Sequence, residues 1–244
     1  MPKFIVNISL IFTEHAMLDR FQLARDVGFQ GVEIQNPYDH DLLKLALAAK
    51  NAKCRVYLIN APFGAEWGNG ANPTATDTFR NEITQAVCHA RALEARFVHI
   101  LSGTNGDLET LCENLKWASR TFPSQTFLIE PINTFDIPNY KLNNFEQALQ
   151  ILNHIKAPNL GLQFDTYHTS RIVNSANIMP VFNTCLPWIK HIQISGNPNR
   201  TEPDQGIVDH AAFFAAVDAS NYDGLIGAEY HPASHDFKWM DLAR

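Results

Sequence analysis

The sequence has few cysteines, and none of them form a pair spaced for metal or redox chemistry. The four cysteines among the 244 residues contain no Cys-x-x-Cys motif; they are Cys54, Cys88, Cys112 and Cys185. Disulfide scaffolds are typical of short secreted chains, whereas scattered thiols in a chain of this length are typical of cytoplasmic proteins. We therefore expect free thiols and a cytoplasmic protein.

The sequence also lacks a long apolar run and an excess of positive charge. No run approaches the ~20 apolar residues of a membrane span. The apolar start at 4–12 is interrupted by Asn7 and Ser9 and precedes no small-residue cleavage site, so we expect a first strand rather than a signal peptide. With 19 basic and 25 acidic residues, the net charge of −6 argues against nucleic acid or a membrane as partner.

Glycine-rich phosphate-binding loops are missing as well. The segments 64–68 and 103–106 contain glycines, but neither has the Gly-x-Gly-x-x-Gly spacing of a dinucleotide-binding turn. Neither is followed by the acidic residue that such a site needs ~20 positions later. We therefore expect no nucleotide cofactor.

The chain contains instead an end-to-end alternation of short apolar runs and amphipathic segments. Eight runs of strand length occur at 4–9, 31–35, 55–60, 97–102, 126–131, 160–165, 189–195 and 225–230. Segments of helical periodicity lie between them at 18–27, 42–52, 79–93, 108–119, 145–155 and 211–219. The segment 170–187 has the weakest helical pattern. Eight repeats predict an α/β fold, a (β/α)8 TIM barrel that fills residues 1–244 as a single domain.

In such a barrel, functional side chains lie at the carboxyl ends of the strands. Four consecutive predicted strands end in side chains with oxygen atoms, about 30 residues apart as βα units are: Glu130, Asp165, Gln193 and Glu229. Three carboxylates in an apolar barrel need a counter-ion, and oxygen ligands suit a hard cation such as Mg²⁺ or Mn²⁺ better than zinc. Alternatively, each acid caps a helix or pairs with a surface lysine.

Seven segments resemble the hydroxypyruvate isomerase family of the xylose-isomerase-like TIM barrels. They are LIFTE at 10–14, GFQGVE at 28–33, IEPIN at 129–133, QFDTYH at 163–168, HIQI at 191–194, RTEPD at 200–204 and GAEYHP at 227–232. The resemblance implies that Glu130, Asp165, Gln193 and Glu229 hold a divalent metal. It also implies that Glu130 and Glu229 move the proton of an isomerisation.

The reaction implied by the resemblance is the isomerisation of a small hydroxy-oxo acid through an enediolate, without an organic cofactor. The first candidate is hydroxypyruvate to tartronate semialdehyde, and a 2-oxo-tetronate isomerase of the same branch is the alternative. The loop at 68–71 and Ile207 depart from the family pattern, which leaves the substrate open. An endonuclease-IV-like nuclease and a non-catalytic binding barrel are the alternative functions from other classes of protein. A homo-oligomer is compatible with the sequence but not derivable from it.

Two polar residues beyond the strand ends are candidate substrate contacts. His168 lies three residues after Asp165, where it could hydrogen-bond a substrate oxygen or lie on the surface. Arg200 follows the seventh strand and could bind a substrate carboxylate, or pair with Glu202 and Asp204 of its own loop. Although the chain has ten histidines, the expected metal site requires none of them.

Three further candidates have equally open roles. Glu33, at the end of the second strand, could line the substrate cavity or cap the next helix. His99 lies on an apolar strand, as His191 does, and each could contact substrate or be a hydrogen-bonded interior histidine. Trp67 lies in the extended loop 61–78, a candidate lid, and could cover the substrate or pack on the barrel rim.

Overall fold

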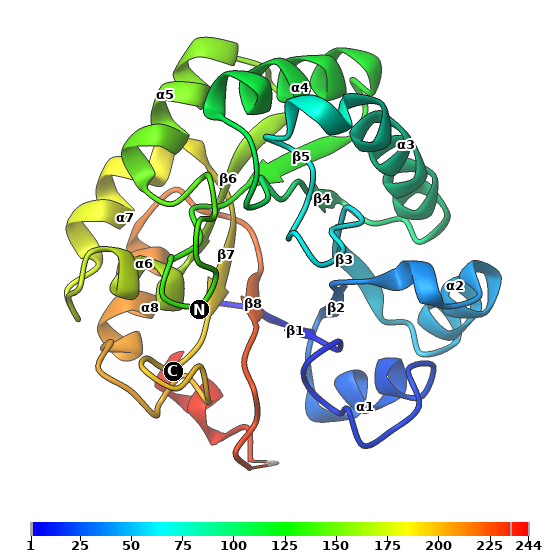
Figure 1. Cartoon of the computed structure of the whole chain (residues 1–244). Coiled ribbons are helices and arrows are strands. Elements are labelled where there is room, and N and C mark those ends of the chain that lie inside the picture. The colour runs from blue at the N-terminus through cyan, green and yellow to red at the C-terminus, as the bar shows by residue number, and fades with distance from the viewer. Residues whose placement is uncertain (1, 235, 244) are drawn as a thin grey trace.

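Eight parallel strands form a closed barrel in the computed structural model, which describes residues 2–234 and 236–243. Each strand pairs with its neighbours in sequence order, and β8 closes the barrel against β1. Figure 1 shows the strands at the centre with the helices around them. The strands are β1 (Phe4–Asn7), β2 (Gly31–Ile34), β3 (Arg55–Asn60), β4 (Phe97–His99), β5 (Thr126–Ile129), β6 (Leu160–Asp165), β7 (Ile189–Ile194) and β8 (Ile226–Ala228).

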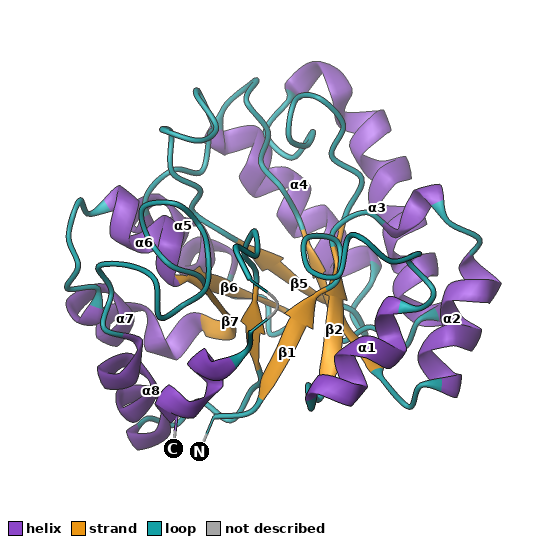
Figure 2. Cartoon of the chain, turned by 90° about the horizontal axis from the view of Figure 1, so that it is seen from below, coloured by secondary structure: helices purple, strands orange, loops and turns teal. Residues whose placement is uncertain are grey.

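Helices connect the strands and cover the outside of the barrel, as the second view in Figure 2 shows. The α-helices are α1 (Arg20–Val27), α2 (Leu42–Asn51), α3 (Thr76–Ala92), α4 (Leu108–Thr121), α5 (Phe145–Ile155), α6 (Thr166–Ile172), α7 (Met179–Cys185) and α8 (His210–Ala219). The 3-10 segments are η1 (Pro37–Asp39), η2 (Pro73–Ala75), η3 (Leu186–Trp188) and η4 (Lys238–Ala243). The predicted TIM barrel is confirmed. Within the described ranges, no helix is both long and apolar enough to cross a bilayer.

Acidic and amide side chains begin most of the helices by accepting backbone N–H groups. The capping residues are Asp41, Asp107, Asn144, Asp165 and Asp209. Asp165 ends β6 and caps α6 at the same time, because its Oδ1 accepts from the N–H groups of Tyr167 and His168 at 2.6 and 3.2 Å. The prediction of one irregular helix at 170–187 was therefore wrong. The helix α6 begins earlier, at the barrel rim, and α7 is a separate helix.

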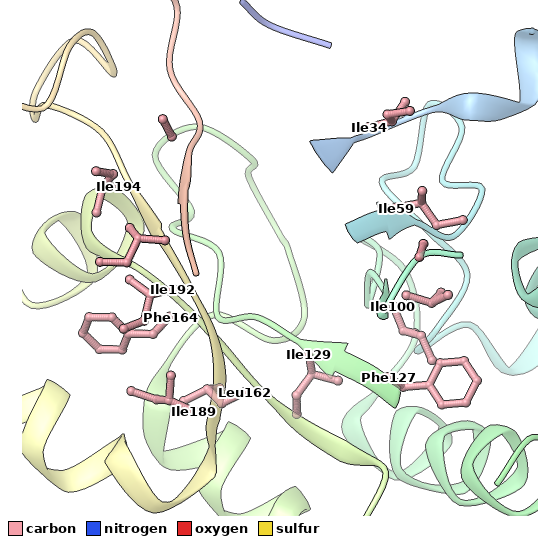
Figure 3. Close-up of a cluster of buried hydrophobic side chains, with 14 of the residues drawn as sticks. Ile34, Ile59, Ile100, Phe127, Ile129, Leu162, Phe164, Ile189, Ile192 and Ile194 are labelled. Carbon is pink, nitrogen blue, oxygen red and sulfur yellow. The ribbon is translucent and has the colours of Figure 1, made fainter. Parts of the chain in front are cut away.

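Side chains on the two faces of the strands belong to different layers. Outward-facing residues pack between the strands and the helices, and Figure 3 shows Ile129, Leu162 and Phe164 among them. Inside the barrel, a separate apolar cluster contains Ile5, Tyr57, Leu58, Phe97 and Leu128.

Polar side chains lie above this apolar floor. Because strand side chains alternate, Asn7, His99 and Glu130 point to the same side as the apolar residues two positions earlier. The barrel therefore has an apolar floor and a polar layer at the carboxyl ends of its strands.

The loop predicted as a lid, 61–78, is tied to the loop that follows β4. The N–H groups of Gly70 and Ala71 donate to the carbonyls of Leu101 and Ser102 at 3.3 and 2.8 Å. Gly106 has a φ of +93°, and a Cβ at this position would lie 1.7 Å from the Ala71 carbonyl oxygen. Only glycine permits this approach, so the two loops are held together at this point.

Candidate active site

The four residues predicted as metal ligands lie at the carboxyl-terminal mouth of the barrel, and all four are buried. Glu130 follows β5, Asp165 ends β6, Gln193 lies on β7 and Glu229 follows β8, with exposed fractions of 4%, 1%, 1% and 7%. The strand order places β5, β6, β7 and β8 side by side. This topology converts positions far apart in the sequence into one polar cluster.

Two glutamine amides link the outer carboxyl groups of this cluster. Gln163 Nε2 donates to Glu130 Oε2 at 2.9 Å and to Gln193 Oε1 at 2.8 Å. Gln193 Nε2 in turn donates to Glu229 Oε2 at 2.7 Å and to Glu33 Oε2 at 2.7 Å. Strand alternation predicts that Gln163 faces inward with Asp165, but the sequence analysis did not assign it to the site. A continuous chain of hydrogen bonds therefore joins Glu130 to Glu229.

Burial raises the pKa of all three carboxyl groups in the cluster. The pKa of Glu130 lies well above its usual value because the group is buried beside Asp165 and Glu229. Burial also raises the pKa of Asp165, although Arg200 opposes the shift. The pKa of Glu229 rises to about 7, again through burial and despite Arg200. Glu229 is thus poised to hold or release a proton near neutral pH unless a cation stabilises its charge.

Arg200 supplies a positive charge to the cluster. Its Nη2 lies 2.6 Å from Glu229 Oε1 and 3.6 Å from Asp165 Oδ2. Its guanidinium lies 5.3 Å from the ring centroid of Tyr167. Glu202, the acid of its own loop, accepts instead from the N–H groups of Ala233 and Ser234. Arg200 therefore faces the carboxyl groups of the site.

The donor set of the cluster fits a hard divalent cation. Glu130 Oε1 and Asp165 Oδ2 are buried oxygens without a hydrogen-bond partner within the described ranges. Ligand atoms of Glu130, Asp165 and His168 lie within 4.8 Å of one another. Buried carboxylate oxygens that accept no hydrogen bond are costly unless a cation or a proton joins them. The carboxyl groups of Glu130 and Asp165 therefore form the centre of a candidate metal site.

His168 belongs to this group by distance, but its hydrogen bonds assign it a different role. Asn133 Oδ1 accepts from the N–H groups of Phe135 and Asp136 at 3.1 and 3.0 Å, which turns Asn133 Nδ2 toward the histidine. Asn133 Nδ2 lies 2.7 Å from His168 Nδ1, so Nδ1 accepts and the proton of the neutral ring is on Nε2. Burial, with Arg200, holds the pKa of His168 well below its usual value. His168 is therefore a hydrogen-bond donor; the sequence analysis missed Asn133, which lies within the IEPIN segment.

Glu33 and His191 lie together in the barrel interior. Both are fully buried, and His191 Nε2 lies 2.5 Å from Glu33 Oε1. The other oxygen of Glu33 accepts from Gln193, and α2 is capped by Asp41. The alternative that Glu33 caps the next helix is therefore wrong. Protein donors occupy both of its oxygens.

His99 and Trp67 have different positions relative to the cluster. His99 Nδ1 lies 3.3 Å from Asn60 Oδ1, and its Nε2 lies 3.7 Å from Glu130 Oε2. Burial lowers the pKa of His99 to about 3, so this interior ring is neutral. Trp67 is 42% exposed and stacks on Phe63 with 5.7 Å between ring centroids. The structure thus brings His99 to the carboxyl cluster and leaves Trp67 in the loop above β3.

Comparisons with known proteins agree with the fold and extend over the site. A family model described as xylose isomerase-like TIM barrel matches residues 21–243. The hydroxypyruvate isomerase of Escherichia coli K12 is 34% identical over an alignment of 264 positions, which spans 100% of both chains. The 2-oxo-tetronate isomerase of Cupriavidus necator is 36% identical over an alignment of 245 positions, which covers 95% of this chain and 94% of that protein. The first of these alignments therefore includes all the strand ends described above.

Solved structures give the same result at the level of the fold. The AP endonuclease, family 2, from Brucella melitensis has a TM-score of 0.91 at 32% identity, over 96% of this chain and 95% of that chain. The D-psicose 3-epimerase from Clostridium cellulolyticum H10 has a TM-score of 0.79 at 15% identity, over 98% and 89%. The second likeness concerns the fold alone.

Proposed function

The chain belongs to the xylose isomerase-like TIM barrel family, and from this membership we propose that it is a metal-dependent isomerase of small hydroxy-oxo acids. The observation that carries the proposal is the pair Glu130 and Glu229. Both carboxyl groups are buried, both have a raised pKa, and they lie at the two ends of one hydrogen-bonded chain. A general acid or base is most effective when its pKa is near the working pH, as that of Glu229 is.

The reaction needs one proton to leave a carbon and another to arrive at its neighbour. For hydroxypyruvate, a carboxylate removes a proton from the hydroxymethyl carbon, which gives an enediolate. The proton of the hydroxyl group moves to the neighbouring former carbonyl oxygen, and a carboxylic acid protonates the former carbonyl carbon, which gives tartronate semialdehyde. Glu130 and Glu229 provide these two groups, on opposite sides of the cluster.

A divalent metal fits this chemistry. We propose Mg²⁺ or Mn²⁺, held by oxygen atoms of Glu130, Asp165, Gln193 and Glu229. When bound, it would supply the positive charge that stabilises the two enediolate oxygens. Glu130 Oε1 and Asp165 Oδ2, which accept no hydrogen bond from the described residues, support this assignment. No organic cofactor is needed for a proton transfer of this type.

Arg200 and His168 are proposed to orient the substrate. The side chain of Arg200 is 20% exposed, and its Nη2 contacts Glu229. Its remaining N–H groups can bind the substrate carboxylate, since a guanidinium presents five donors in a fixed plane. His168 Nε2–H can donate to a substrate oxygen, while the ring stays neutral. Because all four cysteines are free, we also propose a cytoplasmic site of action.

A screen of acids in deuterated water tests the proposal. Hydroxypyruvate and 2-oxo-tetronate are incubated with the protein and Mg²⁺ or Mn²⁺, and deuterium incorporation at carbon is followed by NMR. We expect exchange and isomerisation with at least one of the two acids. The 2-oxo-tetronate alternative is supported by the Cupriavidus necator relative, and the relative rates decide between the substrates. Cleavage of abasic DNA without exchange of either acid would replace the isomerase proposal by a nuclease.

Replacing His168 by glutamine tests its role as donor. We expect kcat/KM to fall by about 10- to 100-fold, because a hydrogen bond to a charged group contributes roughly 1.5–3 kcal/mol. The affinity for Mn²⁺, measured by isothermal titration calorimetry, should change less than about threefold, since His168 is not expected to be a ligand. A loss of metal affinity as large as the loss of kcat/KM would instead make His168 a metal ligand.

A further inference from the structure

We propose that Glu33 is a positioning residue that sets the direction of the hydrogen bonds reaching Glu130 and Glu229. The residues that transmit this direction are Gln193 and Gln163, and we call the three residues Glu33, Gln193 and Gln163 the amide ladder. The inference rests on the proposed function, because it assigns the ladder to the two carboxyl groups that move the proton. Glu33 is not assigned a part in proton transfer; its Oε1 contacts His191 Nε2 and its Oε2 accepts from Gln193.

Glu33 fixes the orientation of the first amide of the ladder, that of Gln193. Its side chain is fully buried, with Oε1 at 2.5 Å from His191 Nε2 and Oε2 at 2.7 Å from Gln193 Nε2. A carboxylate that receives two donors can only accept, so Gln193 must turn its NH2 group, and not its carbonyl, toward Glu33. The second hydrogen of that NH2 group is then directed to Glu229 Oε2, at 2.7 Å.

The direction passes from Gln193 to the second amide. Because the NH2 group of Gln193 faces Glu33 and Glu229, its carbonyl Oε1 faces Gln163 and accepts from Gln163 Nε2 at 2.8 Å. Gln163 must therefore also present its NH2 group, whose second hydrogen reaches Glu130 Oε2 at 2.9 Å. Reversal of the ladder would place a carbonyl oxygen against each catalytic carboxyl group. Each carboxyl group would then lose one donor and gain an electrostatic repulsion.

The backbone of β8 makes room for Glu33. A Cβ at Gly227 would lie 2.0 Å from Glu33 Oε1 and 2.7 Å from its Cδ. Gly227 is paired in register with Gln193 of β7 and Ile5 of β1. Only a glycine at this position leaves space for the carboxylate, so the position of Glu33 is fixed by neighbouring strands as well as by hydrogen bonds.

The variant Glu33→Gln tests the direction of the ladder. Glutamine has nearly the same shape as glutamate, but its NH2 group can donate, so Gln193 is free to reverse. We expect kcat to fall about 10- to 100-fold, as for other residues that orient a site from behind, while KM changes less than about threefold. Unchanged thermal unfolding would show that the loss is not one of folding.

A spectroscopic measurement makes the test independent of turnover. In protein labelled with 15N-glutamine, the side-chain NH2 signals of Gln163 and Gln193 are identified by their loss in Gln163→Met and Gln193→Met. We expect Glu33→Gln to shift the Gln163 signal, although Gln163 does not touch residue 33. Gly227→Ala, which crowds Glu33 without changing its charge, should shift the same signals. Glu82→Gln, a carboxyl group on α3 outside the ladder, is the matched control and should shift neither.

The two proposals fail in different ways. An unchanged Gln163 signal in Glu33→Gln overturns the ladder, whatever the activity. A rise in KM with unchanged kcat also overturns the proposal, because Glu33 would then contact substrate. A wild-type protein that exchanges deuterium with neither acid overturns the proposed function, and the amide signals still report whether the ladder exists.

Discussion

Replacing Glu130 or Glu229 by glutamine is expected to lower kcat for isomerisation by about 10²- to 10⁴-fold, the usual contribution of a positioned acid or base. Glutamine preserves the shape of each side chain, but its amide neither accepts the substrate proton nor returns one. In the proposed mechanism, each residue serves as base in one direction of the reaction and as acid in the other. The loss should therefore appear in both directions, measured by NMR with either acid of the pair as substrate.

The two variants should differ in the half-reaction that they retain. The variant that keeps the group facing the hydroxymethyl carbon of hydroxypyruvate should still exchange that carbon's hydrogen with deuterated water, without forming product. The variant that lacks this group should lose both exchange and isomerisation. The comparison thus identifies which glutamate acts first. Glu82→Gln is the control for a general effect of removing a carboxyl group, and full turnover in either active-site variant would contradict the mechanism.

Much of the fold and part of the site could be predicted from the sequence because they depend on short-range patterns. The alternation of apolar runs and amphipathic segments determines the barrel, and the barrel determines which residues end the strands. Glu130, Asp165, Gln193 and Glu229 were grouped by this reasoning, and the structure places all four at one mouth. Their roles as metal ligands stay a prediction, which titration with a divalent metal tests.

Contacts across the barrel could not be predicted in the same way. Glu33 of β2 reaches His191 and Gln193 of β7, and these strands are not neighbours in the sheet. Such contacts depend on strand tilt and side-chain length, which a periodic pattern does not contain. The role of Glu33 is therefore open between substrate contact and helix cap in the sequence alone.

Loop conformation limited the predictions for the residues around the site. Arg200 has a φ of +53°, a left-handed conformation that sequence patterns rarely predict for arginine. This conformation brings its guanidinium to Glu229 rather than to the acids of its own loop. Likewise, the tautomer of His168 depends on Asn133, whose orientation is set by two backbone N–H groups of the loop after β5.

Removing divalent cations is expected to abolish isomerisation, and the affinity of the metal-free protein for Mn²⁺ is expected to rise with pH. Burial raises the pKa of Glu130 and Asp165, and that of Glu229 to about 7. A cation must therefore displace protons from these groups. Each proton displaced makes the apparent affinity rise up to about tenfold per pH unit below the pKa of the group. For Glu229 this rise should end near pH 7.

The same shifts determine how the stability of the metal-free protein depends on pH. A carboxyl group whose folded pKa is raised keeps a proton that the unfolded chain has released, so its contribution to stability is lost as pH rises toward the folded pKa. The buried histidines act in the opposite direction: the lowered pKa of His99, of His168 and of His210 makes stability fall as pH decreases below 6.5. Above pH 6.5 only the effect of the carboxyl groups remains. Ionisation of Glu229 alone should lower the free energy of unfolding by about 1 kcal/mol between pH 6.5 and 8.

Calorimetric titration with Mn²⁺ at pH 6, 7 and 8, in two buffers of different ionisation enthalpy, counts the protons released. We expect about one more proton released at pH 6 than at pH 8, because Glu229 is protonated in the first case and ionised in the second. The Glu229→Gln variant should bind the metal more weakly but lose this difference, since its amide has no proton to displace. Proton release that is independent of pH in the wild type would mean that the metal is held elsewhere. Activity that survives exhaustive chelation would show that Arg200 alone provides the positive charge for the enediolate.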